Sequence, residues 1–349
     1  MTGQLTEAPA PAPVRPARRA LGALSRLDRR FLPVLGTVLT LALMLGIGQS
    51  RYSTSRSDFI SMKLLSNLMV DNSYLLVLAV GMTFVILTGG IDLSVGAVVA
   101  LVGLVVAKLF LLGLPLPVVL AVGVLIGTAC GLLIGVLVQV FDIQPFIASL
   151  AVMFLARGLA NVVSTNSLAI KDEGFASLAS WSLTFGEGRS LWRINASMVI
   201  AVAVLLVAVF LLHYTRFGRS VYGLGASDRG VAVSLMGLRP ARTRVWVYVI
   251  SGTCAGIAGI LFALYTKSGY NLTGIGMELD AIAAVVIGGT LLSGGVGFVL
   301  GTGAGVLVYG LIQVLIAREG LDSWWTRVFI GAVLLLFVML QRLIVTRRR

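Results

Sequence analysis

Five ionisable residues lie within or beside long apolar segments, and these are the positions at which the chain could do chemistry inside a membrane. They are Asp92, Lys108, Arg157, Glu278 and Asp280. A charged side chain at membrane depth is costly and therefore marks a substrate path, an ion relay or an ion pair. So few charges give poor support for a proton or sodium relay, and an uncharged, hydroxyl-rich substrate is more compatible with them.

Helix capping competes with a substrate role at three of these positions. Asp92 follows two glycines and precedes Leu93-Ser94, so it could cap the N-terminus of the next helix. Glu278 and Asp280 open an apolar segment, where a carboxylate suits the positive end of the helix dipole. No cap explains Arg157, which could pair with an acid in the bundle or face a wet cavity.

An eight-residue phrase occurs twice, at residues 89–96 and 288–295, and both copies read G-G-x-x-L-S-x-G. Gly-interrupted segments at corresponding places in two halves of a chain are the best sequence indication of a transport pathway. We therefore predict a transporter. The candidate pathway residues are Asp92, Ser94, Arg157, Asn161, Tyr265, Asn271, Thr290 and Ser293.

The chain carries no sequence motif of an enzyme or an ATPase. It contains no G-x-x-x-x-G-K-[ST] phosphate loop, no cluster of metal ligands and no nucleophile elbow. Cys130 and Cys254 lie far apart in apolar stretches, where buried structural thiols are expected. We expect no catalytic residue, cofactor or metal, and any ATP would be hydrolysed by partner subunits.

The composition is that of a membrane protein. Hydrophobic residues make up 58% of the 349 residues and charged residues only 12%, about half the share in a soluble domain. Mean hydropathy is +1.01. The 41 glycines suit a bundle in which helix backbones approach closely.

Apolar segments of about 20 residues, the length that a membrane span requires, number ten. Their approximate bounds are 31–49, 64–88, 92–112, 115–140, 145–164, 196–213, 243–266, 279–296, 298–317 and 323–345. The predicted fold class is all-α, a polytopic bundle of about ten transmembrane helices, with an allowance of one pair at the Gly-rich breaks. The repeated phrase follows the second and eighth spans. This offset of six spans would give both copies the same orientation, whereas an inverted repeat needs an odd offset, so the symmetry of the repeat stays open.

Basic residues set the predicted orientation. Lys and Arg cluster before the first span, in the loop 214–242 and after the last span, so all three should be cytoplasmic. The predicted organisation is a disordered tail 1–30, a transmembrane domain 31–345 and a basic tail 346–349. Residues 165–195 form a long extracytoplasmic segment, which either docks a partner protein or is a structured cap with interfacial Trp residues.

The loop 214–242 also shows a local pattern typical of a docking helix. Ser227 can cap a short helix, Asp228 suits its first turn, and Gly237 suits the position after its end. Val231 and Leu235 fall on one face of that helix. A helix lying on the membrane surface is the alternative. The predicted coupling residues are Arg216, Gly218, Ser227, Asp228, Val231, Leu235 and Gly237.

Four long motifs follow one another in an order that resembles one protein family. They are A-V-G-M-T-F-V-I-L-T-G-G-I-D-L-S-V-G at 79–96, T-R-F-G at 215–218 with L-M-G at 235–237, E-L-D-A-I-A at 278–283 and V-I-G-G-T at 286–290. Together they resemble the permease subunits of bacterial monosaccharide ABC importers of the ribose-permease type. The resemblance runs from about Phe59 to Arg342. Within this family, residues 290–297 and 323–326 are most similar to a galactofuranose importer permease.

This resemblance implies a multi-pass protein of the bacterial cytoplasmic membrane. Its partners would be a cytosolic ABC ATPase, a second and different permease, and an extracytoplasmic sugar-binding protein. Closure of the ATPases on ATP would push on the 226–237 helix and rock the bundle between two states. The sugar would pass between the two permeases.

Three other classes of protein remain as alternatives. An ion-coupled secondary transporter of a small polar solute would need buried acidic partners and no docking helix. An integral-membrane enzyme acting on lipid-linked sugars would need clustered ionisable groups at one membrane face. The sequence shows neither arrangement. A passive channel fits the composition and is disfavoured only by the resemblance.

Overall fold

The computed structural model describes residues 32–53, 58–188, 190–226, 234 and 237–346. The predicted tail 1–30 and residues 347–349 lie outside the described part. So do Ser227, Asp228, Val231 and Leu235 of the predicted docking helix.

The described chain is mostly helical, as expected. In chain order the helices are α2 (Leu32–Tyr52), α3 (Met62–Asp71), α4 (Ser73–Leu87), α5 (Val95–Leu111), α6 (Leu116–Gln139), α7 (Pro145–Val163), α8 (Glu173–Ser180), α9 (Ala196–Tyr214), α10 (Arg216–Ala226), α12 (Pro240–Thr266), α13 (Met277–Ile287), α14 (Val299–Arg318) and α15 (Ser323–Thr346). Proline opens α7 and α12, where its missing N–H costs nothing. Asn195 caps α9 by accepting a hydrogen bond from the Met198 backbone N–H.

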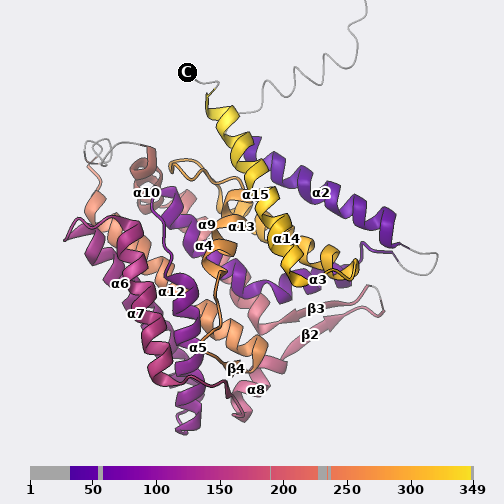
Figure 1. Ribbon diagram of the computed structural model, residues 1–349, viewed down its shortest axis with the longest axis horizontal. Helices are drawn as coiled ribbons and strands as arrows, with labels where there is room; N and C mark the ends of the chain where they lie inside the picture. Colours follow the sequence, from indigo (N-terminus) through magenta and orange to yellow (C-terminus); the bar gives the residue numbers. More distant parts are fainter. Residues whose placement is uncertain (1–31, 54–57, 189, 227–233, 235–236, 347–349) are drawn as a thin grey trace, which may run out of the picture.

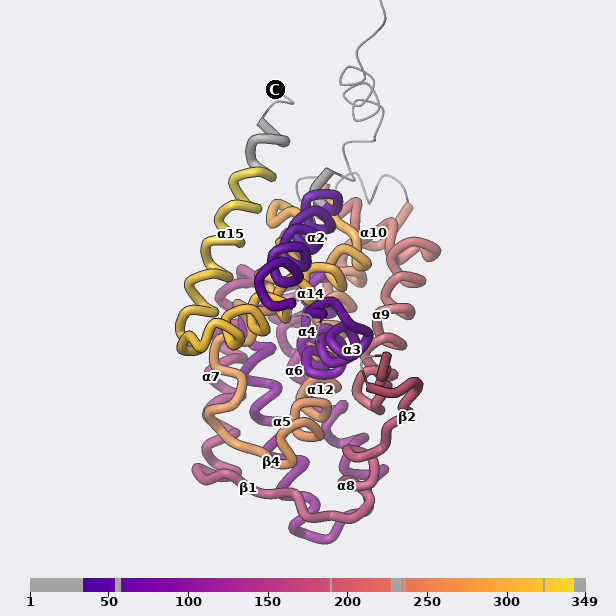
Figure 2. The backbone as a smooth tube through the Cα atoms, turned by 90° about the vertical axis from the view of Figure 1, so that its right-hand side faces the viewer, coloured from indigo at the N-terminus to yellow at the C-terminus, as the bar shows by residue number. Residues whose placement is uncertain are grey.

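Two short antiparallel sheets lie among these helices. Strand β1 (Leu168–Ala169) pairs with β4 (Ser268–Gly269), and β2 (Ser182–Phe185) forms a hairpin with β3 (Trp192–Asn195). Both sheets and α8 lie at one end of the bundle, and α10 lies at the opposite end (Figures 1 and 2). We call these the hairpin end and the α10 end.

The number of spans differs from the predicted ten. Among the described residues, seven helices are long and apolar enough to cross a membrane alone, or eight if α3 and α4 form one bent span. The predicted spans 92–112 and 279–296 correspond to α5, with 17 residues, and α13, with only 11. The Gly-rich breaks account for the difference, because part of each apolar segment there is irregular backbone and the helix is correspondingly shorter.

Irregular backbone enters the bundle at four places. A bend of 60° separates α3 from α4 at Asn72. The Gly-rich phrases follow α4 and α13. Before α13, the segment 270–276 runs back along α5, so a Cβ atom at Gly96 would lie 2.4 Å from the Gly274 carbonyl oxygen. Such backbone is tolerated at membrane depth only where protein covers it.

The central helix of the bundle is α12, which packs most extensively on α6. Glycines at every fourth position of α6 face glycines of α12. A Cβ atom at Gly127 would lie 2.3 Å from the Gly252 oxygen, and one at Gly131 would lie 2.2 Å from the Tyr248 oxygen. The two backbones are therefore in direct contact, which is how small residues stabilise helix pairs in lipid.

Candidate functional site

The two copies of the repeated phrase meet at the α10 end of the bundle. The backbone N–H of Gly295 donates to the carbonyl oxygen of Leu87, the last residue of α4, at 2.8 Å. Gly294 has a φ of +82°, and a Cβ atom there would lie 2.8 Å from the Gly89 nitrogen. The break after α13 is thus joined directly to the break after α4.

Helix α10 covers this junction. A Cβ atom at Gly225 would lie 2.0 Å from the Leu87 oxygen and 2.3 Å from the Gly295 nitrogen. The Tyr222 hydroxyl donates to the Gly297 carbonyl oxygen at 2.9 Å. Burial raises the pKa of Tyr222 to about 12, so this hydroxyl keeps its proton at neutral pH. We call Leu87, Gly225, Gly294, Gly295 and Tyr222 the junction.

The T-R-F-G motif makes the sharp corner between α9 and α10. The Thr215 hydroxyl donates to the Leu211 carbonyl oxygen at 2.5 Å and accepts from the Gly218 N–H at 3.2 Å. A Cβ atom at Gly218 would lie 2.0 Å from the Leu212 oxygen, so no larger residue fits there. Arg216 is exposed. The corner aims α10 at the junction. Gly237, another predicted coupling residue, has a φ of +71°.

Asp92 is fully buried in the bundle interior. One of its carboxylate oxygens accepts from the Ser94 N–H at 2.9 Å and from the Ser94 hydroxyl at 2.7 Å. The other accepts from the Ser251 hydroxyl of α12 at 2.8 Å. Asp92 therefore binds the start of α5 to α12, although the N-cap position of α5 is Ser94, two residues further along the chain.

Thr290 and Ser293 lie in the second break but differ in exposure. Ser293 is exposed, whereas Thr290 is fully buried. Among the described residues, the Thr290 hydroxyl is one of three buried side-chain atoms without a hydrogen-bond partner. A buried hydroxyl without a partner costs about 1–3 kcal/mol, so it requires an explanation such as a second conformation or a passing ligand.

Three other candidate residues form one polar cluster nearer the hairpin end. Arg157 of α7 donates to the carbonyl oxygens of Asn271 and Thr273 at 2.8 and 2.6 Å. The Asn271 amide donates to Asn161, one turn further along α7, at 2.5 Å. The guanidinium thus ties the returning segment 270–276 to α7, and Glu278 lies close enough to act on it electrostatically.

Tyr265, the last candidate, lies apart from this cluster near the end of α12. Its side chain is half exposed, and its ring centroid lies 6.2 Å from that of Tyr74 and 6.3 Å from that of Phe262. It lines a polar pocket at the hairpin end. The candidate residues therefore separate into a group around the breaks, the cluster on α7 and this pocket.

Sequence reasoning missed three parts of these sites. Ser251 was overlooked because a lone serine in a long apolar helix gives no signal of its own. Tyr222 and Gly225 lie in the loop 214–242, where the pattern directed attention to residues 227–237. The T-R-F-G corner immediately before them is the signal that could have led there.

Two Gly-rich breaks are joined under a short helix in a bundle of long apolar helices, which is the architecture of a multi-pass membrane protein. The family model described as the permease component of the branched-chain amino acid transport system matches residues 64–338. The chain belongs to this family. As a permease component it is not itself an enzyme.

Several characterised relatives match nearly the whole chain. The fructose import permease protein FruG of Bifidobacterium longum is 41% identical over 91% of this chain and 92% of its own length. The inner membrane ABC transporter permease protein YjfF of Escherichia coli is 42% identical, with 90% and 93% covered. The E. coli ribose import permease protein RbsC is 37% identical, with 83% and 88% covered. No solved structure gives a significant match.

Proposed function

We propose that this chain is the membrane-spanning permease subunit of an ATP-driven ABC importer for a monosaccharide. The observation that carries the proposal is the family match over residues 64–338, together with relatives named as fructose, ribose and L-arabinose permeases. The sequence has no ATP-binding motif of its own. A cytosolic ABC ATPase therefore supplies the energy through a protein contact.

The junction is the part of the chain through which that contact acts. The ATPase presses on the loop 214–242, and α10 transmits the displacement to Leu87 and Gly295 at once. Because these residues end or follow α4 and α13, both interrupted helices move together. Such a step shifts the bundle between two pre-existing states, as alternating access requires.

The remaining partners follow from the proposed orientation in the cytoplasmic (inner) membrane. The termini and the α10 end, with Arg216 and Arg219, face the cytoplasm. The segment 165–195 at the hairpin end meets an extracytoplasmic sugar-binding protein. A second, different permease completes a heterodimer, and the sugar passes between the two permeases.

The proposed pathway uses the candidate residues in two groups. Asp92, Ser94, Thr290 and Ser293 lie around the breaks, and Arg157, Asn161, Tyr265 and Asn271 lie toward the hairpin end. The unpartnered hydroxyl of Thr290 supports the first group, since a sugar hydroxyl could satisfy it during passage. The ion-coupled alternative is not favoured, because the buried acid Asp92 is already bonded to two serines.

Galactofuranose is the sugar that we propose. The support is the resemblance of residues 290–297 and 323–326 to a galactofuranose importer permease. Uptake of radiolabelled D-galactose, whose solution contains the furanose form, with unlabelled D-galactose, ribose, fructose and L-arabinose as competitors, tests this choice. D-Galactose should compete best, and stronger competition by any other sugar would refute the assignment while leaving the importer class intact.

The test of the proposed function is a mild-detergent pull-down of the chain from its native membranes. Stoichiometric recovery of a nucleotide-binding ATPase and a second permease is expected. Recovery of the chain alone, repeated after crosslinking, would refute the proposal and favour a transporter that works without an ATPase.

A further inference from the structure

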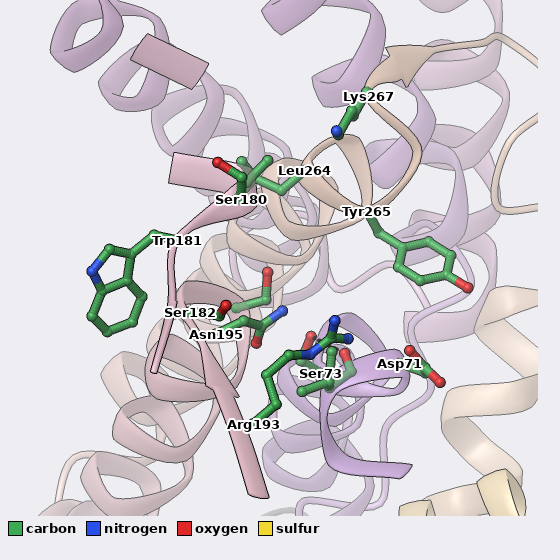
Figure 3. Close-up of a pocket in the computed structure, with 13 residues that line it drawn as sticks. Asp71, Ser73, Ser180, Trp181, Ser182, Arg193, Asn195, Leu264, Tyr265 and Lys267 are labelled. Atoms are coloured by element: carbon green, nitrogen blue, oxygen red, sulfur yellow. Dashed lines mark hydrogen bonds between the residues drawn. The ribbon is translucent and has the colours of Figure 1, made fainter. Parts of the chain in front are cut away.

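A polar pocket of about 210 Å³ lies at the hairpin end, apart from the junction (Figure 3). Its wall comes from α3, α4, α8, the β2–β3 hairpin, α9 and α12. The polar residues that line it include Asp71, Ser73, Ser182, Arg193, Asn195, Tyr265 and Lys267. Figure 3 shows Arg193 extending toward Ser73 with Asn195 beside it, whereas Trp181 points away from these groups.

Local hydrogen bonds hold this wall in place. The Ser66 hydroxyl of α3 donates to the Arg193 carbonyl oxygen at 2.6 Å and accepts from the Arg193 N–H at 2.9 Å, so strand β3 is fixed to α3. Asn195 uses its side-chain oxygen to cap α9. The ring contacts of Tyr265 with Tyr74 and Phe262 position the opposite side. The pocket is therefore built on secondary structure.

Its charged groups are available for a ligand. Arg193 lies close enough to Asp71 to act on it electrostatically. Within the described part of the chain, however, the side chains of Asp71, Arg193 and Lys267 make no hydrogen bond or ion pair. One carboxylate and two cationic side chains, all exposed to solvent, thus line the pocket without a direct protein partner.

We propose that this pocket binds one monosaccharide. This proposal rests on the proposed function and adds a sugar-binding stage at the hairpin end to it. The pocket is small, and polar side chains from several elements line it, which suits a compact ligand rich in hydroxyl groups. Adjacent hydroxyls of a sugar both donate and accept, which suits the mixed set of Asp71, Arg193 and Asn195. An anion would meet the carboxylate of Asp71, and a cation would meet Arg193 and Lys267. Tyr265 supplies an aromatic side for the ring.

The position of the pocket links it to the junction. Helix α4 begins at the pocket with Ser73 and ends at Leu87, which is bonded to Gly295. A helix of 15 residues is about 22 Å long and moves as a rigid body. A sugar held at the hairpin end therefore contacts the same helix that α10 displaces at the other end.

Saturation-transfer NMR on the purified permease complex tests the site, with D-galactose and D-ribose as probes. Asp71→Asn combined with Arg193→Gln should weaken binding about tenfold or more, because charge-assisted hydrogen bonds are lost. Ser182→Trp is a second variant, which fills the pocket from an exposed strand position and leaves the charged groups in place. Glu187→Gln, on the same hairpin but outside the pocket, is the matched control and should bind normally.

Two results would overturn this inference. One is unchanged sugar binding in both pocket variants, and the other is displacement of the sugar by inorganic phosphate, which would show an anion site. ATP-driven uptake measured in parallel separates the two proposals. If the wild type takes up sugar but the pocket variants bind it as well as the wild type does, the proposed importer function stands and the proposed site is refuted. A wild type that neither binds nor takes up any monosaccharide refutes the proposed function itself.

Discussion

The backbone N–H of Gly295 donates a hydrogen bond to the carbonyl oxygen of Leu87, 2.8 Å away. The Gly-rich break after α13 is thereby bonded to the last residue of α4, the helix that precedes the other break. Gly225 of α10 touches both partners of this bond, so close that no side chain fits between them. A displacement of α10 therefore reaches both interrupted helices through backbone contacts. Backbone atoms cannot move aside by changing rotamer, as side chains can.

Gly225→Val should abolish coupling. The new Cβ atom would lie 2.0 and 2.3 Å from backbone atoms of Leu87 and Gly295, so α10 must move off the junction. We expect transport to fall at least about tenfold while ATPase subunits still co-purify. Gly331→Val is the matched control, because a Cβ atom there meets nothing within 4 Å. Normal uptake by the Gly225 variant would show that the junction only fills space.

Asp92→Ala should destabilise the protein. It leaves the Ser94 N–H and the hydroxyls of Ser94 and Ser251 buried without their acceptor, at a cost of about 1–3 kcal/mol or more. Asp92→Asn keeps one acceptor oxygen, so its effect on thermal unfolding in detergent should be smaller. A stable Asp92→Asn protein that has lost transport would instead assign this residue to the pathway.

Arg157→Met should release the segment 270–276 from α7. The carbonyl oxygens of Asn271 and Thr273 lose their donors, while the apolar stem of the side chain is kept. In a Leu272→Cys background the thiol should then react faster with a maleimide, about tenfold or more if the segment opens. Arg157→Lys keeps one charged donor and should react at an intermediate rate. Equal labelling rates in all three proteins would contradict this role.

The double variant Asp228→Lys, Leu235→Glu tests the predicted docking helix, which lies outside the described residues. It places an unfavourable charge at the helix N-terminus and a carboxylate on the apolar face. Membrane insertion should be normal, whereas uptake and co-purification of the ATPase should both be lost. Uptake at the wild-type rate would refute docking and favour a helix on the membrane surface.

Sequence patterns of short range predicted the fold well. Each predicted apolar segment corresponds to at least one helix, because about 20 apolar residues in a row leave few alternatives. The count of about ten spans is not confirmed at α5 and α13, since hydropathy cannot distinguish a full span from a short helix followed by a Gly-rich break. The sequence identified Gly218 as a coupling residue, but neither the corner at Gly218 nor the contact of Gly225 with Leu87 was predicted.

Pairings between residues far apart in the chain could not be predicted from the sequence. Nothing in the spacing of Asp92 and Ser251, or of Arg157 and Asn271, indicates that they meet, because tertiary packing of whole helices brings them together. The sequence did identify both residues of the second pair as pathway candidates from residue type alone. Their grouping with Asn161 required the structure.

ATP dependence of sugar uptake is the measurement that tests the central claim most directly. Proteoliposomes containing the complete complex, with ATP on the ATPase side and the binding protein loaded with labelled sugar on the other, should accumulate sugar. This uptake should stop when the ATPase is inactivated and persist in the presence of proton and sodium ionophores. Uptake that needs no ATP and collapses with the ionophores would contradict the account and identify an ion-coupled transporter.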